Sequence, residues 1–267
     1  MNICVCIKQV PDTNRIKIDP VTNTLVRKGV PSIINPFDTY AVEMAANLKE
    51  RFGGKVVVMS MGPEQALGAL RVCLSVGADE AYLISDRAFG GSDTLATGYI
   101  IAGAIRHIEK LEGIKFDVIM CGKQAIDGDT AQVGPQVAEQ LGLPQVTYAV
   151  DIEGSSRNIV IRREVDGGFD LTKVQLPTVI TVVSSKQMPR YATYATRSDA
   201  KKKTIHVLNS AALPEIDTAQ CGLNGSPTRV VRTYTPVVVK HGVNLEGESA
   251  EEIADNLISM LDAKMLL

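Results

Sequence analysis

Short, wholly apolar segments alternate with amphipathic segments over the first 143 residues, and this alternation limits the possible folds more than any other feature. Apolar strands are predicted at residues 2–10, 55–62, 80–85 and 116–122, and helices at 37–54, 63–77, 94–113 and 131–142. Strands without a polar face are typical of a parallel sheet that helices cover on both sides. We therefore predict a doubly wound α/β domain that binds ligands at the carboxyl ends of its strands.

The pattern changes after residue 143. Strand-like segments follow one another without helices between them, at residues 145–153, 158–168, 169–176 and 178–185. We expect them to add antiparallel strands to the same sheet. Residues 204–267 contain prolines in extended-looking sequence and then one helix near residues 250–261. We therefore predict an α/β domain over residues 1–200 and, over residues 201–267, an arm that needs a partner surface.

Charge and cysteine usage exclude several classes of protein. The 28 basic and 30 acidic residues nearly balance, whereas a general nucleic-acid binder has a basic excess. No signal peptide is recognisable, and no apolar run approaches the ~20 residues of a membrane span. The five cysteines form no C-x-x-C pair and lack metal-ligand spacing, so we expect free thiols, no metal site and a cytoplasmic location. No nucleophile motif accompanies the histidines, so no catalytic side chain is predicted.

The segment "CGKQAIDGDTAQVGPQ", residues 121–136, joins an apolar strand to a helix. Gly122 would let a ligand approach without a Cβ atom, and Asp127, Gly128 and Asp129 would form a tight turn. Thr130 is a good N-cap, which would leave the amides of residues 130–133 for a phosphate. The alternative is a plain strand–turn–helix junction, which needs the same residue types without a ligand. Neither a P-loop nor a Rossmann glycine motif is present.

The segment "INPFD" starts another predicted helix at the same edge of the sheet. Asn35 and Pro36 mark the helix start, and Asn35 or Asp38 can cap the helix or bond a ribose or base. A plain helix cap is the alternative. The connection before it, residues 11–36, carries four prolines and a predicted hairpin at residues 17–27.

Together, these segments resemble the beta subunit of electron transfer flavoproteins. The resemblance covers nearly the whole chain, and its most specific block is "GKQAIDGD". It also includes "VCIKQVPD", "INPFDTYAVE", "MGPEQA", "TAQVGPQVAEQLGLPQVTYA", "LPTVIT" and "PRYAT" followed by "KKK".

The resemblance implies an adenine-nucleotide-binding α/β domain that forms a heterodimer with an alpha subunit. The pocket of the beta subunit holds AMP in simple electron carriers and a second FAD in electron-bifurcating members. Transferred residue by residue, the cofactor site would comprise Cys6, Asn35, Pro36, Phe37, Asp38, Met61, Gly122, Lys123, Gln124, Ala125, Ile126, Asp127, Gly128, Asp129, Thr130, Ala131, Gln132 and Val133. Cys6 would contribute its backbone to the adenine.

The segment "DGDTAQVGP" resembles the FAD-binding branch, where Gly128 leaves space and Thr130 and Gln132 meet the diphosphate. The implied activity is transfer of a hydride from NADH to this FAD. Electrons would then pass to ferredoxin or flavodoxin and, through the FAD of the alpha subunit, to an acyl-CoA dehydrogenase-type partner. Two alternatives stay open: a simple carrier with structural AMP, and a nucleotide-binding module of the universal-stress type.

The resemblance also implies that residues 184–199 dock the partner dehydrogenase. Simple carriers tend to have a leucine three residues before the proline of "PRYAT", and this chain has Lys186 there. Met188 is the large apolar side chain between Lys186 and Tyr191, and a flexible thioether suits a shallow pocket. Lys186, Met188, Arg190 and Tyr191 are the predicted docking residues.

Overall fold

The computed structural model describes residues 1–12, 31–154, 158–231 and 242–266. The hairpin predicted at residues 17–27 lies outside these ranges. The chain divides into two units, Met1–Val231 and Arg232–Leu267. Within the described residues, the first unit contains a nine-stranded sheet in the order β11-β5-β4-β1-β6-β10-β7-β8-β9 and a separate two-stranded sheet of β2 and β3.

The centre of the large sheet is parallel, as the apolar segments predict. It contains β1 (Ile3–Cys6), β4 (Val56–Met61), β5 (Glu80–Ile84) and β6 (Val118–Gly122). β1 lies between β4 and β6, so the chain builds the sheet outward from β1 in two directions. The carboxyl ends of β1 and β6 therefore border the switch point where such folds bind ligands.

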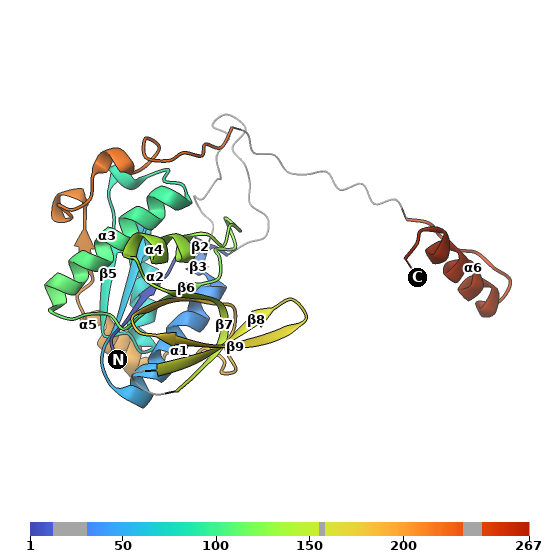
Figure 1. The fold of residues 1–267 in the computed structure, drawn as a ribbon, viewed down its shortest axis with the longest axis horizontal. Coiled ribbons are helices and arrows are strands. Elements are labelled where there is room, and N and C mark those ends of the chain that lie inside the picture. Colours follow the sequence, from blue (N-terminus) through green and yellow to red (C-terminus); the bar gives the residue numbers. More distant parts are fainter. Residues whose placement is uncertain (13–30, 155–157, 232–241, 267) are drawn as a thin grey trace. The chain divides into compact units, whose positions relative to one another are not determined.

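Helices cover both faces of this sheet (Figure 1). One face packs against α1 (Pro36–Phe52) and α2 (Leu67–Ser75), the other against α3 (Thr94–Glu112) and α4 (Val133–Leu141). Successive residues of a strand point to opposite faces: Ile3 and Val5 join the first core cluster, and Cys4 joins the second. A short 3₁₀ turn precedes α2 at Glu64–Ala66, and another, Arg87–Phe89, lies between β5 and α3.

The prediction for residues 145–185 is half right. β8 (Asn158–Val165) and β9 (Gly168–Gln175) are antiparallel additions. β7 (Gln145–Gly154) and β10 (Thr178–Val182) are not, because β10 enters between β6 and β7 and pairs in parallel with both. β10 is buried along its whole length, which is typical of a central parallel strand.

The apolar segment at residues 2–10 forms two strands, although one is predicted. β1 ends at Cys6, and residues Gln9–Pro11 form β2, which pairs antiparallel with β3 (Ser32–Ile34). β2 and β3 therefore lie beside the large sheet. Next to them, the N–H of Asn35 donates to the carbonyl of Lys8 at 2.9 Å. This pairing brings the start of α1 next to the end of β1.

Residues 204–231 belong to the first unit, so the boundary lies further along the chain than the predicted position after residue 200. Helix α5 (Tyr194–Lys202) leads to β11 (His206–Leu208), which pairs in parallel with β5 at the edge of the sheet. Two 3₁₀ turns follow at Ser210–Ala212 and Thr218–Gln220. Leu208, Leu213, Ile216 and Cys221 are buried against the α3 side of the core, which holds this segment to the domain.

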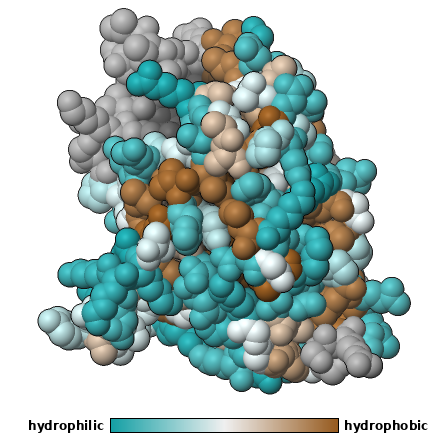
Figure 2. All heavy atoms as spheres, turned by 90° about the vertical axis from the view of Figure 1, so that its left-hand side faces the viewer, coloured by the Kyte–Doolittle hydropathy of each residue, from teal (hydrophilic) through white to brown (hydrophobic). Residues whose placement is uncertain are grey.

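The second unit contains α6 (Ala250–Ala263), as predicted for residues 250–261. Ser249 caps it, since its hydroxyl accepts the N–H of Glu252 at 3.2 Å. The first unit has a mainly hydrophilic surface on the side that Figure 2 shows, with hydrophobic side chains gathered in a few patches. This surface is expected, because most of the apolar residues are buried in two core clusters between the sheet and its helices.

Candidate functional site

The carboxyl ends of β1 and β6 meet the first turn of α1 and the loop that leads into α4. Cys6 at the end of β1 lies opposite Cys121 in the register of β1 with β6. The segments that follow these two strands therefore leave the sheet side by side. We call residues 122–133, together with Asn35 and Asp38, the cradle. Its geometry depends on side chains that are almost fully buried.

Asn35 holds the cradle loop through both ends of its amide. Its Nδ2 donates to the carbonyl of Gln124 at 2.7 Å, and its Oδ1 accepts the N–H of Ile126 at 3.1 Å. The side chain is 1% exposed. Asn35 occupies the N-cap position of α1, as predicted, but its side chain makes no capping hydrogen bond. The amide instead connects the start of α1 to the loop after β6.

Asp38 joins the ends of the two central strands. Its carboxylate accepts the N–H of Lys8 at 2.7 Å and the N–H of Gly122 at 2.8 Å. Burial raises the pKa of Asp38 from its ordinary value of 3.8 to about 7, although these two N–H groups, Asn35 and the charge of Lys8 act in the opposite direction. The carboxylate is therefore a structural acceptor whose protonation changes near neutral pH.

A compact turn forms the outer part of the loop. The N–H groups of Gly128 and Asp129 both donate to the carbonyl of Ala125, at 3.1 and 2.8 Å. Asp127, whose side chain is 4% exposed, pairs with the ammonium of Lys8 at 2.6 Å. A turn thus forms where one was predicted at residues 127–129, but it begins at Ala125, and the carboxylate of Asp127 faces inward.

The end of the loop is held in an unusual backbone conformation. Asp129 and Ala131 have positive φ angles of 55° and 53°, a region that residues other than glycine rarely adopt. Gln124 donates through its side-chain amide to the carboxylate of Asp129, and the side chain of Gln132 accepts the hydroxyl of Thr94 at 3.0 Å. Strained backbone that its surroundings hold in place is frequent in ligand sites.

The helix after the loop begins at Val133, and Gln132 occupies the N-cap position that we predicted for Thr130. Within the described parts of the chain, the backbone N–H groups of residues 130–133 donate no hydrogen bond. Unpaired N–H groups and the helix dipole together form an anion-binding site at the start of a helix. The cradle can therefore accept a phosphate.

The two glycines of the loop have different roles. A Cβ atom on Gly122 would lie 2.5 Å from a carboxylate oxygen of Asp38 and 2.6 Å from the Cβ atom of Phe37. The atoms that approach Gly122 thus belong to α1, whereas we predicted a ligand. A Cβ atom on Gly128 would meet nothing within 4 Å, so open space adjoins the turn.

The remaining predicted cofactor residues lie at the same edge of the sheet. Cys6 and Met61 are half-buried near the ends of β1 and β4, Phe37 is half-buried, and Pro36 is exposed. A hydrogen bond with Cys4 and burial hold the pKa of the Cys6 thiol well above its ordinary value. The thiol of Cys6 therefore stays protonated near neutral pH.

The predicted docking residues lie away from the cradle and differ in their surroundings. Met188 and Tyr191 are 76% and 92% exposed. The ammonium of Lys186 pairs with Asp151. Arg190 is engaged by α1: its Nε donates to Glu43 at 2.9 Å, and its guanidinium also pairs with Glu50. Arg190 therefore anchors the segment to the domain, whereas we predicted it to contact a partner.

Three residues of the site escape sequence reasoning. Lys8 lies two residues after β1, inside the segment that we predicted as one strand, so the prediction hid its place at the end of the sheet. Thr94 starts α3 far away in the sequence, and only the packing of α3 against α4 brings it to Gln132. Tyr148 approaches the cradle from β7, and no local pattern predicts its positive φ of 64°.

Across residues 1–12, 31–154, 158–231 and 242–266, no three His, Cys, Asp or Glu side chains converge on a possible metal position. None of the helices described there combines the length and the apolar character needed to cross a membrane.

Comparisons with known proteins agree with the resemblance noted in the sequence. Residues 22–213 match the electron transfer flavoprotein domain. An electron transfer flavoprotein subunit beta from Megasphaera elsdenii is 48% identical over 271 residues, which cover all of both chains. The caffeyl-CoA reductase-Etf complex subunit CarD of Acetobacterium woodii is 45% identical over 268 residues, again all of both chains. Protein FixA of Azotobacter vinelandii is 46% identical over 88% of this chain and 84% of its own.

Replacing Asn35 with alanine should destabilise the protein and open the cradle loop. The carbonyl of Gln124 and the N–H of Ile126 would lose their partner, and each unpaired buried group costs about 1–3 kcal/mol. We expect the free energy of unfolding in urea to fall by about 2–4 kcal/mol. Asn244→Ala, at an exposed position, is the matched control and should change little. Equal urea midpoints for Asn35→Ala and the parent would contradict the role of the clamp.

Asp38 should make stability depend on pH between about 4 and 7. Because its pKa is about 7 in the folded chain and 3.8 ordinarily, the folded chain holds this proton to a higher pH. The resulting stabilisation is complete below about pH 4 and is lost as the pH rises through about 7. The Asp38→Asn variant has no titrating group at this position. The unfolding free energy of the parent should therefore fall relative to that of Asp38→Asn, by about 1.4 kcal/mol per pH unit. A difference that stays constant from pH 4 to 7 would disprove the shift.

Proposed function

This chain belongs to the family of electron transfer flavoprotein beta subunits, and on that basis we propose that its cradle binds FAD. The observation that carries the proposal is the row of unpaired N–H groups at residues 130–133, next to the open space at Gly128. The amides and the helix dipole suit a diphosphate, and a turn without a side chain at Gly128 leaves room for a long ligand.

FAD is favoured over AMP by the residues around the turn. Gly128 has no Cβ to fill the adjacent space. Gln132, at the start of α4, is oriented by its hydrogen bond with Thr94 of α3. Thr130 is exposed beside the unpaired amides. These features support contacts of Thr130 and Gln132 with a diphosphate, which FAD has and AMP lacks. A simple carrier with structural AMP is the second candidate, because AMP also carries a phosphate for the same amides.

When bound, FAD would take a hydride from NADH and pass electrons on singly, to ferredoxin or flavodoxin and, through the FAD of an alpha subunit, to an acyl-CoA dehydrogenase-type enzyme. The residues of this chain would hold and orient it. Asn35 and Asp38 would keep the loop and the strand ends rigid, and the amides of residues 130–133 would bind the diphosphate. No side chain needs to act as a general acid or base.

The relatives support an electron-transfer role over that of a universal-stress-type nucleotide module. The relative from Acetobacterium woodii is named as a subunit of a caffeyl-CoA reductase-Etf complex, and a CoA-thioester enzyme is the class of partner that we propose here. A simple nucleotide-sensing module would also not need the C-terminal unit or the segment before α5. Five free cysteines are consistent with the cytoplasmic location that forms part of the same proposal.

The nucleotide content of the purified heterodimer tests the proposed function. We expect about two FAD molecules and almost no AMP per heterodimer, because the alpha subunit and the cradle would each hold one flavin. Acid extraction followed by chromatography measures both nucleotides. One FAD together with one AMP would overturn the FAD assignment and support the simple carrier, and the absence of any nucleotide from this subunit would overturn both.

We also propose that α6 packs against the alpha subunit. Within the second unit, its apolar side chains Ile253, Leu257, Met260 and Leu261 follow the spacing of one helix face. Ile253 and Leu257 are 38% and 42% exposed. Because an amphipathic helix is stabilised by burying its apolar face, this helix needs a partner surface.

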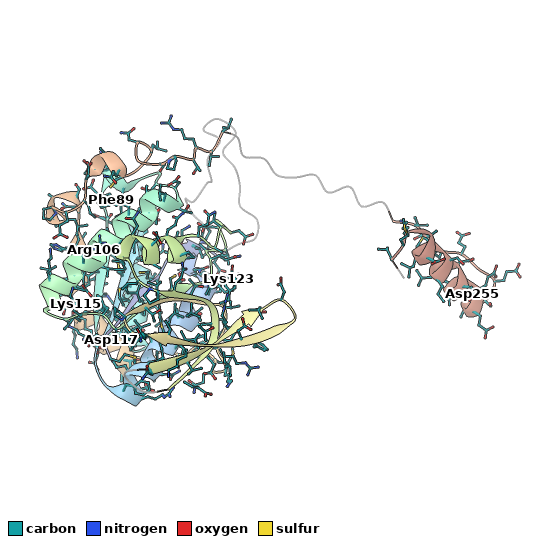
Figure 3. The ribbon with its side chains drawn as sticks, in the orientation of Figure 1. Phe89, Arg106, Lys115, Asp117, Lys123 and Asp255 are labelled. Carbon is teal, nitrogen blue, oxygen red and sulfur yellow. The ribbon has the colours of Figure 1, made fainter. Side chains whose placement is uncertain are left out.

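Leu257→Glu should weaken the heterodimer. Losing the burial of one leucine costs about 2 kcal/mol of association energy, and the buried charge adds to the loss. The exposed Asp255, labelled in Figure 3, offers the matched control Asp255→Ala on the same helix. Sedimentation velocity at several concentrations measures the dissociation constant. Identical constants for Leu257→Glu and Asp255→Ala would refute this role of α6.

The segment before α5 remains our proposed docking site for the dehydrogenase. Met188 and Tyr191 point outward, while Arg190 is bound to Glu43 and Glu50 of α1. The ion pairs of Arg190 hold the backbone that carries Met188 and Tyr191 in place. Less conformational entropy is therefore lost when these two side chains dock.

Met188→Ala should raise the apparent KM of the heterodimer for the dehydrogenase about threefold to tenfold, since an exposed anchor side chain contributes about 1 kcal/mol. The visible flavin spectrum and reduction by NADH should not change, because Met188 lies away from the cradle. Electron-transfer rates at several dehydrogenase concentrations provide the measurement. Val207→Ala, an exposed apolar side chain on β11 at the other edge of the sheet, is the control. If both variants behave as the parent, Met188 is not the anchor.

A further inference from the structure

A lysine of the cradle lies over an aromatic ring from a different part of the sheet. Lys123 directly follows β6 and is labelled in Figure 3. Its ammonium lies 4.9 Å from the centre of the ring of Tyr148, which belongs to β7. Because β10 separates β6 from β7, this contact reaches across the carboxyl end of β10. Lys123 is fixed at its base, since its N–H donates to the carbonyl of Val182 at 2.7 Å.

Tyr148 has a backbone conformation that tyrosine rarely adopts. Its φ angle is 64°, in the left-handed region, where a residue with a Cβ costs about 1–2 kcal/mol. The pairing of β7 with β10 shifts by one residue here, and the N–H of Tyr148 donates to the hydroxyl of Thr181 at 3.0 Å. Glycine or asparagine would suit such a bulge better. The strain therefore points to a use for the tyrosine ring.

The charge of Lys123 is not neutralised within the described chain. The other lysine at the cradle, Lys8, pairs with Asp127. Among the described residues no carboxylate pairs with Lys123, and the ring of Tyr148 is its contact. An aromatic face attracts and orients an ammonium without cancelling its charge, whereas a carboxylate would cancel it. The ammonium therefore remains able to attract an anion.

We propose that Lys123, held by the ring of Tyr148, binds a phosphate group of the nucleotide in the cradle, and that Tyr148 is a positioning residue. This inference rests on the proposed function, because it assigns an anionic contact to the same ligand. The unpaired amides of residues 130–133 lie in the same loop as Lys123. An ammonium and backbone amides on one loop form a phosphate site from two kinds of donor.

The test uses the nucleotide-stripped heterodimer and two probes that differ only in charged groups. ADP carries the diphosphate, and adenosine lacks it. Tyr148→Phe keeps the ring and should bind ADP like the parent. Tyr148→Asn removes the ring and tolerates the left-handed backbone, so the chain should fold. Lys123→Met removes the charge. We expect Tyr148→Asn and Lys123→Met each to weaken ADP binding about tenfold, and the double variant to weaken it no further.

Adenosine separates a charge contact from damage to the fold, because its affinity should be unchanged in every variant. Lys173→Met on β9 removes an exposed lysine elsewhere and should leave ADP binding unchanged. Unaltered ADP affinity in Lys123→Met, or equal loss of ADP and adenosine affinity in Tyr148→Asn, would overturn the inference alone. Failure of the parent heterodimer to bind either probe would overturn the proposed function as well.

Discussion

The site depends on one structural constraint, which is the insertion of two polar side chains from the start of α1 between the ends of the central strands. Asn35 satisfies backbone groups of the loop after β6, and Asp38 accepts N–H groups from the ends of both β1 and β6. These hydrogen bonds are buried at Gly122 and partly buried elsewhere, and leaving a buried group unpaired is costly. The amide and the carboxylate thus set the path of the loop, and the loop in turn places the start of α4.

The charged side chains around Asn35 and Asp38 leave positive groups available for an anionic ligand. Asp38 and Asp127 both point inward, one toward backbone N–H groups and the other toward Lys8. The carboxylates are therefore occupied by the protein itself, while backbone amides at α4 and the ammonium of Lys123 remain available. This arrangement supports our proposal that the cradle binds phosphate, although the whole chain carries a net charge of −2.

The same helix connects the site to the segment that we propose for docking. Asn35 precedes α1 and Asp38 lies in its first turn, while its later turns carry Glu43 and Glu50, which bind Arg190. Sequence reasoning found these positions but gave several of them the wrong neighbours. Gly122 and Arg190 were expected to face a ligand and a partner, and each instead makes its main contact within the domain; Asn35 is at the helix start as expected, but its side chain binds the loop after β6. Local pattern identifies special residues, but it cannot tell which distant segment satisfies them.

By itself, the sequence determined the layered α/β architecture, the edge of the sheet that carries the site and the family, because apolar periodicity and a specific local motif are properties of neighbouring residues. Only the tertiary structure decided the parallel insertion of β10, the attachment of residues 204–231 and the approach of Lys8, Thr94 and Tyr148 to the cradle. These features depend on pairing between segments that are far apart in the chain. Strand order and buried hydrogen bonds are chosen by the free energy of the whole packed domain, which no single stretch of sequence records.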